Sequence, residues 1–201
     1  MKEKTVKVTV MAMLVAISVV FVFIVHVPLI PAVSFLEYDP ADIPILIGAF
    51  VYGPAAGVLL TIAASAVQAL TVSAQSGLFG FVMHVISTCV LTVTASIIYR
   101  RSKNAKSLTL GLFAGTVAMA VVMLAANHFI TPLFITSDLS DTAALAQNRA
   151  YIDTLLIPAI LPFNLIKAGI NSVITSIVFT MVKKYIPGAD TADTSKGNKA
   201  E

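Results

Sequence analysis

Charged residues are scarce in this chain. Asp, Glu, Lys and Arg make up 11% of its 201 residues, whereas 58% of the residues are hydrophobic. A soluble domain carries about 25% charged residues, so much of this surface must face lipid instead of water. At about 20 apolar residues per crossing, the chain has room for roughly six membrane helices and none for a soluble catalytic domain. The composition therefore predicts one all-α integral membrane domain.

Cysteine is almost absent as well, and motifs typical of catalysis are missing. The single Cys89 lies in an apolar stretch, which excludes a disulfide framework and a cysteine-rich metal site. The sequence has no GxxxxGKS/T loop for nucleotide phosphates, no GxSxG nucleophile elbow and no HExxH pair. We therefore expect no catalytic residues, no metal site and no cofactor. Because the chain cannot hydrolyse ATP itself, concentrative transport would need an energy source in another subunit.

Apolar runs divided by Pro, Gly and charged clusters predict six helices. Gly53-Pro54 separates the second from the third, and both are shorter than a full bilayer span. The polar stretch 136–153 is expected to be an outer loop. Residues 1–189 form one membrane domain in this interpretation, and 190–201 form a polar tail. The predicted helices span 8–27, 42–52, 54–70, 78–99, 108–134 and 155–182.

The placement of charge predicts the topology. Six spans put the amino terminus, the connection after the fourth helix and the carboxyl terminus on one side, and eleven of the thirteen Lys and Arg residues lie there. The positive-inside rule then places both termini in the cytoplasm. Because the basic residues flank apolar segments, the net charge of +3 reports topology and not nucleic-acid binding.

Five polar residues stand out inside the apolar helices. Asn164, Lys167 and Asn171 are spaced by three and four residues, so they lie on one stripe of the last helix. Asn127 and His128 lie near the outer end of the fifth helix. Polar groups in a bilayer need a partner, which is either a neighbouring helix or a ligand. Amides both donate and accept, so this set favours reversible binding of a heterocycle with carbonyls and ring nitrogens.

One histidine and two pairs of small residues are further candidates for binding or for helix packing. His84, in the middle of the fourth helix, is expected to be a buried hydrogen-bonding residue or a ligand contact. The pairs Ala12–Ala16 and Gly111–Gly115 each place two small residues one turn apart, which lets another helix approach closely. That helix can belong to this chain or to a partner.

Three stretches carry a resemblance that covers nearly the whole chain. On them the chain resembles the substrate-binding S components of energy-coupling factor (ECF) vitamin transporters, and within these the riboflavin-specific members. The resemblance implies an S-component-like bundle in which Asn127, Asn164 and Lys167 bind the flavin. The stretches are Glu37-Tyr-Asp-Pro-Ala-Asp-Ile-Pro-Ile-Leu-Ile-Gly-Ala-Phe50 followed by Gly53-Pro54, Asn127-His-Phe-Ile-Thr-Pro132 and Pro162-Phe-Asn-Leu-Ile-Lys167.

The resemblance also implies partners and a lid. An S component in the cell membrane captures a vitamin from outside and docks on a membrane T subunit with two cytoplasmic ATPases. It implies that Ala12 and Ala16 face the T subunit, and that Phe35, Leu36 and Tyr38 belong to a loop that closes over riboflavin. The complete set of expected substrate-binding residues is Asn127, Asn164, Lys167, Asn171, His84, Tyr38 and Leu36.

Three alternatives stay open on the sequence. The first is an S component for another vitamin, such as pantothenate, because Val67-Gln-Ala-Leu70 departs from the Lys-Asn-Leu-Leu-like stretch of riboflavin members. The second is a membrane-embedded enzyme that uses His84 or His128. The third is a stand-alone channel or facilitator.

Overall fold

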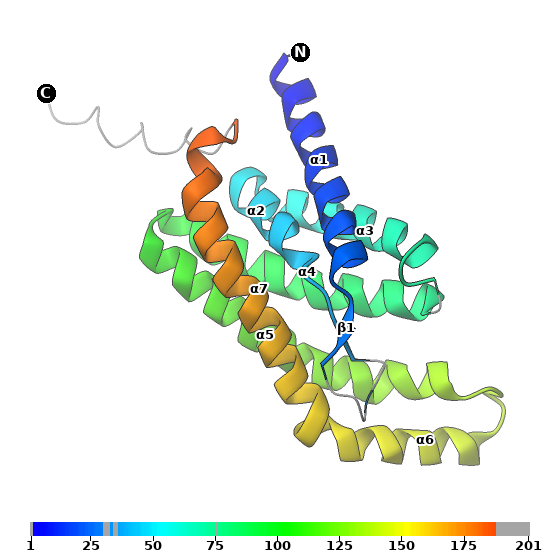
Figure 1. The fold of residues 1–201 in the computed structure, drawn as a ribbon. Helices are drawn as coiled ribbons and strands as arrows, with labels where there is room; N and C mark the ends of the chain where they lie inside the picture. The colour runs from blue at the N-terminus through cyan, green and yellow to red at the C-terminus, as the bar shows by residue number, and fades with distance from the viewer. Residues whose placement is uncertain (1, 30–32, 34–35, 75, 188–201) are drawn as a thin grey trace, which may run out of the picture.

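A computed structural model describes residues 2–29, 33, 36–74 and 76–187. The described chain is helical apart from one small β-hairpin and the connections (Figure 1). The hairpin pairs β1 (Val27–Pro28) with β2 (Glu37–Tyr38). The α-helices are α1 (Lys2–Ile24), α2 (Asp42–Tyr52), α3 (Pro54–Leu70), α4 (Gly77–Ser102), α5 (Ala105–Ile135), α6 (Thr142–Leu155) and α7 (Leu161–Val182); a π segment, η1 (Leu156–Ile160), and a 3₁₀ turn, η2 (Lys183–Tyr185), complete the set.

Length and hydropathy identify the helices that could cross a membrane. Among the described residues, four are long and apolar enough: Glu3–Ile24, Gly77–Ser102, Ala105–Ile135 and the continuous stretch Thr142–Tyr185. The helices α2 and α3 are apolar but shorter. Gly53 separates them because its φ of 99° is not helical, and glycine adopts this conformation without strain. Pro54 begins α3, where its missing N–H does little harm.

The largest difference from the sequence-based expectation is α6. The polarity of 136–153 predicted a loop, but Thr142–Leu155 is helical. The Asp141 carboxylate caps it by accepting the N–H groups of Ala143 and Ala144, and its Ala, Leu, Gln and Arg residues are good helix formers. Only Ile152 is buried within α6. The polar sequence of this segment is therefore that of an exposed helix.

The junction between α6 and α7 also differs from a single helix beginning at 155. Pro158 and Pro162 cannot donate backbone hydrogen bonds, and η1 lies between the two helices with the Leu161 N–H bonded to the Leu156 carbonyl. Figure 1 shows α6 running at a steep angle to α7. The bend places the start of α7 beside the end of α5, with which η1 and α7 are in contact.

The short helix α2 is the centre of the bundle. Its residues from Asp42 to Val51 are all buried, and it contacts α1, α3, α4 and α7. Near its end, the Phe50 ring packs against Tyr99 and Phe179, with ring centroids 5.0 and 5.2 Å apart. A helix that is apolar on nearly all sides, as α2 is, suits such a buried position. This packing fixes Asp42, at the start of α2, against the inner faces of α4 and α7.

The helices α4 and α5 pack closely through small residues. A Cβ at Gly111 would lie 2.6 Å from the Ala95 carbonyl oxygen, and one at Gly115 would lie 2.8 Å from that of Leu91. Neither position has room for a side chain without a shift of the backbone. The Gly111–Gly115 pair therefore serves contact between helices of this chain.

Candidate functional site

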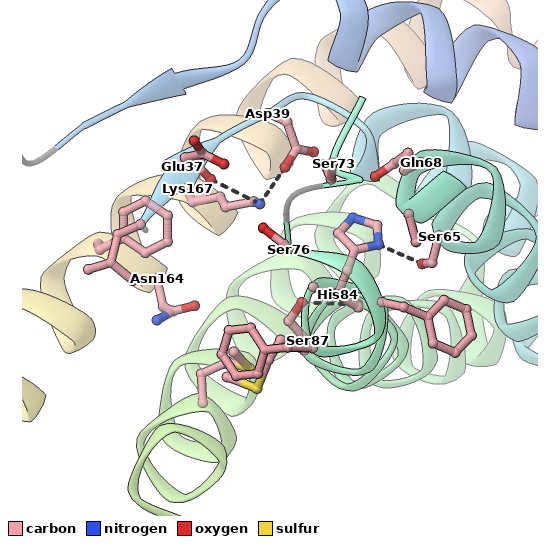
Figure 2. Close-up of a pocket in the computed structure, with 18 of the residues that line it drawn as sticks. Glu37, Asp39, Ser65, Gln68, Ser73, Ser76, His84, Ser87, Asn164 and Lys167 are labelled. Atoms are coloured by element: carbon pink, nitrogen blue, oxygen red, sulfur yellow. Dashed lines mark hydrogen bonds and ion pairs between the residues drawn. The ribbon is translucent and has the colours of Figure 1, made fainter. Parts of the chain in front are cut away.

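A pocket lies between the α1–α2 connection, α3, α4, α5 and α7 (Figure 2). Five of the seven residues predicted to bind a substrate line it: Leu36, His84, Asn127, Asn164 and Lys167. Asn171 and Tyr38 are not among the lining residues. The walls also carry residues that sequence reasoning did not assign to the site, among them His26, Glu37, Asp39, Gln68 and several serines.

Lys167 is buried and forms an ion pair across the pocket wall. Its Nζ lies 2.7 Å from Asp39 Oδ2 and 3.5 Å from the Glu37 carbonyl oxygen. The Ala41 N–H donates to the other oxygen of Asp39, at 3.0 Å. Burial alone would raise the pKa of the Asp39 carboxyl, but the Lys167 ammonium and these hydrogen bonds outweigh it and hold the pKa below its usual range. The pair ties the α1–α2 connection to α7.

Asn171 continues the stripe of Lys167 but binds protein groups only. Its Nδ2 donates to the Asp39 carbonyl at 3.1 Å and to Asp42 Oδ2 at 2.9 Å, while its Oδ1 accepts from the Tyr38 hydroxyl at 3.1 Å. The side chain is fully buried. Asn171 and Tyr38 therefore position the acidic connection above the pocket.

Two asparagines face the pocket from α5 and α7. Asn127 Nδ2 donates to the Met123 carbonyl, and Asn164 Nδ2 donates to the Ile160 carbonyl, both at 2.8 Å. Asn127 Oδ1 also accepts from Thr131, at 3.0 Å. Bonds to their own helices fix both side chains before a ligand arrives, which reduces the ordering cost of binding.

His84 lines the pocket from α4. Its Nδ1 lies 2.7 Å from Ser65 Oγ on α3, and its Nε2 lies 3.9 Å from Asp42 Oδ1. Asp42 in turn accepts from Thr88, at 2.6 Å. The imidazole thus belongs to a polar network that links α2, α3 and α4 on the opposite wall from Asn164 (Figure 2).

His128 is not part of the pocket. Its Nδ1 lies 2.5 Å from Asp153 Oδ1, so it joins α5 to α6. The two histidines therefore do not form one acid–base site. Among the described residues, no group of three His, Cys, Asp or Glu side chains could hold a metal ion.

A polar contact between side chains closes the base of the β-hairpin. His26 Nε2 lies 2.7 Å from Glu37 Oε2, next to the pairing of Val27 with Tyr38. Both His26 and Glu37 line the pocket. The hairpin therefore forms one rim of the site. The predicted lid residue Phe35 lies outside the described residues, as does the predicted tail 190–201.

The two predicted docking residues lie on the outer face of α1. Ala12 and Ala16 are exposed, and they share this surface with the exposed Met13 and Ile17. On the opposite face Ser18 is buried and donates to the Ala41 carbonyl at 2.8 Å. The small-residue pair of α1 is thus free of contacts that would bury it inside the bundle.

Sequence reasoning missed Asp39 and Gln68. Asp39 was not assigned to the site, although a Lys inside an apolar helix requires an anionic or ligand partner. Gln68 was noted only as a departure from a family pattern, although it is a polar residue in an apolar helix. The rule that selected Asn127 and Asn164 would have selected Gln68 too.

Comparisons with known proteins point to one family. The family model for the ECF transporter, substrate-specific component, matches residues 6–179. The riboflavin transporter FmnP of Bacillus subtilis (strain 168) is 28% identical over 189 residues, covering 91% of this chain and 95% of FmnP. The riboflavin transporter RibU of Staphylococcus aureus (strain TCH60) is 26% identical over 177 residues, covering 87% and 89%.

The fold has a close counterpart among solved structures. A chain described under "Structure and mechanism of the S component of a bacterial ECF transporter" superposes with a TM-score of 0.74 and 24% identity. The match covers 93% of the present chain and 99% of that one.

Proposed function

The chain belongs to the family of substrate-specific components of ECF transporters, and we propose that it is the high-affinity riboflavin-binding subunit of an ATP-driven ECF importer. The curated relatives are riboflavin transporters that align with it almost end to end. The observation that carries the proposal is the pocket lined by Asn127, Asn164 and Lys167. The family consists of transporter components, so the alternative of an enzyme using His84 or His128 is wrong.

Each wall of the pocket has a distinct role in the proposed binding mode. The amides of Asn127 and Asn164 and the ammonium of Lys167 bind the carbonyls and ring nitrogens of the flavin. Phe163 and the Met side chains of α5 pack against its flat ring. Leu36 covers the ligand from the α1–α2 connection, while Tyr38 and Asn171 hold that connection in place.

We propose six membrane crossings with both termini in the cytoplasm. The protein is a multi-pass membrane protein with four long apolar helices and two short ones, α2 and α3. Lys and Arg concentrate at the amino terminus, between α4 and α5 and at the carboxyl end, which supports this orientation. The pocket then opens toward the outside, as capture of an external vitamin requires.

The energy for uptake is proposed to come from partner subunits. The sequence has no nucleotide-binding loop, so a membrane T subunit and two cytoplasmic ATPases supply ATP hydrolysis. The exposed Ala12–Ala16 face of α1 is the proposed contact with the T subunit. A stand-alone facilitator would instead move the vitamin in liposomes without ATP.

The first prediction concerns the ligand itself. Riboflavin is expected to raise the unfolding temperature of the purified protein, because a ligand that binds only the folded state stabilises it by about 2.7 kcal/mol at 100 times Kd. The measurement is a thermal-shift series in detergent with riboflavin, pantothenate and other vitamins, followed by calorimetric titration. Stabilisation by pantothenate and not by riboflavin would replace riboflavin with that vitamin as the substrate.

The second prediction concerns charge. Riboflavin 5′-phosphate is expected to bind at least about tenfold more weakly than riboflavin, because Glu37 and Asp39 line the pocket and its Lys167 is already paired. Competition titrations at low and high salt measure both affinities. The difference should shrink as salt screens the repulsion. Equal affinity for the two compounds at low salt would contradict this electrostatic account.

A further inference from the structure

The pocket has two walls of different chemistry. The wall formed by α5 and α7 presents amides, an ammonium and apolar side chains, as described above. The facing wall, formed by α3, α4 and the connection between them, presents hydroxyls, one amide and one imidazole. We refer to this second set as the hydroxyl wall: Ser65, Gln68, Ser73, Ser76, His84 and Ser87.

Most of the buried polar groups on the hydroxyl wall have partners within the protein. Ser65 bonds to His84 at 2.7 Å, and Ser87 donates to the His84 carbonyl at 3.1 Å. Gln68 is the exception. Its side chain is 5% exposed, and its Nε2 has no hydrogen-bond partner in the described part of the chain.

This unpaired donor differs from the two other unpaired buried side-chain atoms among the described residues. Those atoms are Arg149 Nε on α6 and Thr175 Oγ1 on α7, and neither residue lines the pocket. Gln68 does, and Figure 2 shows it on the side of the pocket away from Asn164. A buried amide donor without a partner is costly, so a ligand atom that accepts its proton would remove that cost.

The surroundings decide which acceptor fits. A phosphate is disfavoured, because the carboxylates of Glu37 and Asp39 lie in the same pocket and Lys167 is already paired with Asp39. A neutral hydroxyl is favoured, because it can accept from Gln68 and donate to a serine oxygen or the imidazole at the same time. A ligand with several hydroxyls along a chain could form hydrogen bonds with several polar side chains of the hydroxyl wall.

We propose that Gln68 is a specificity-determining residue whose Nε2 donates a hydrogen bond to a hydroxyl of the ligand's polyol chain, which lies along the hydroxyl wall. This inference rests on the proposed function, since a flavin with a ribityl chain has both a heterocycle and a polyol. It assigns the heterocycle to the α5 and α7 wall and the chain to α3 and α4.

The test compares two flavins on one variant. Gln68→Met keeps the length of the side chain and removes its donor. Riboflavin affinity should fall about tenfold, because a ligand hydroxyl loses its donor in a buried site. Affinity for lumiflavin, in which a methyl group replaces the ribityl chain, should stay within about twofold. The ligand-free variant should also unfold about 2–4 °C higher, because the unpaired donor is gone.

Controls separate this inference from the proposed function. Val67→Met, at the exposed neighbouring position, should change neither affinity nor unfolding temperature. Equal losses for both flavins, or no loss for either, would overturn the role of Gln68 while leaving riboflavin binding intact. Failure of the wild-type protein to bind either flavin would instead refute the proposed function, and the inference with it.

Discussion

Lys167→Met is expected to lower riboflavin affinity at least about 100-fold and to reduce the free energy of unfolding by about 3–5 kcal/mol. The affinity falls because Lys167 is the one Lys or Arg side chain that lines the described pocket, and its ammonium is proposed to bind the flavin. The stability falls for a separate reason. Removing the ammonium leaves Asp39 buried without its partner at 2.7 Å, and a buried unpaired carboxylate is strongly unfavourable.

A double variant separates the two effects. Lys167→Met combined with Asp39→Asn removes both charges, and the amide oxygen introduced by Asp39→Asn can still accept the Ala41 N–H that the carboxylate accepts. Its stability should return to within about 1–2 kcal/mol of the wild type, because buried ion pairs contribute little beyond neutral replacements. Riboflavin affinity should remain low, because the ligand has lost its cation. Thermal or denaturant unfolding in detergent gives the stabilities, and flavin titration gives the affinities.

A neighbouring residue gives the matched control. Ile166 is exposed on the lipid side of α7, so Ile166→Met should change neither quantity. Full riboflavin affinity in Lys167→Met would remove Lys167 from the binding site. A double variant as unstable as Lys167→Met would show that the ion pair is not the source of the stability loss.

The sequence predicted the polar residues of the pocket better than their partners. Lys167 and Asn164 could be chosen because ionisable and amide groups in an apolar helix need an explanation, and both line the pocket. The sequence could not show that Asp39 is the partner of Lys167, because that contact depends on how the α1–α2 connection folds back over α7. Asn171 shares the helical stripe, yet its bonds go to Tyr38, Asp39 and Asp42. Helical spacing fixes a direction, but tertiary contacts decide what lies there.

The same limit explains the missed helix. Low hydropathy over 136–153 indicated that the segment is not a membrane span. A helix that does not cross the membrane, such as α6, needs no long apolar run. Polarity alone does not distinguish a loop from an exposed helix. The capping residue Asp141 and the run of good helix formers after it were the available signals. The prolines at 158 and 162 predicted an interruption, but their effect on the angle between α6 and α7 required the structure.

Replacing the two alanines on α1 is expected to reduce uptake strongly without weakening binding. In Ala12→Leu combined with Ala16→Leu, two bulky side chains cover the face on which a partner helix would pack closely. Both positions are exposed on the side of α1 opposite the buried Leu14 and Ser18, so the bundle itself should tolerate the change. Riboflavin affinity should stay within about twofold. ATP-dependent uptake by the complete transporter should fall more than about tenfold, and copurification of the T subunit should be lost.

Ala125 offers a matched control for the α1 variant. It is an exposed alanine on α5, so Ala125→Leu adds the same kind of apolar side chain to a lipid-facing surface away from α1. If the α1 face is the docking site, this variant keeps both binding and uptake. Loss of uptake in both variants would point to a general effect of bulk in the membrane. Normal uptake and normal assembly of the α1 double variant would mean that the T subunit contacts another face, since close helix packing at Ala12 and Ala16 cannot accommodate two leucines.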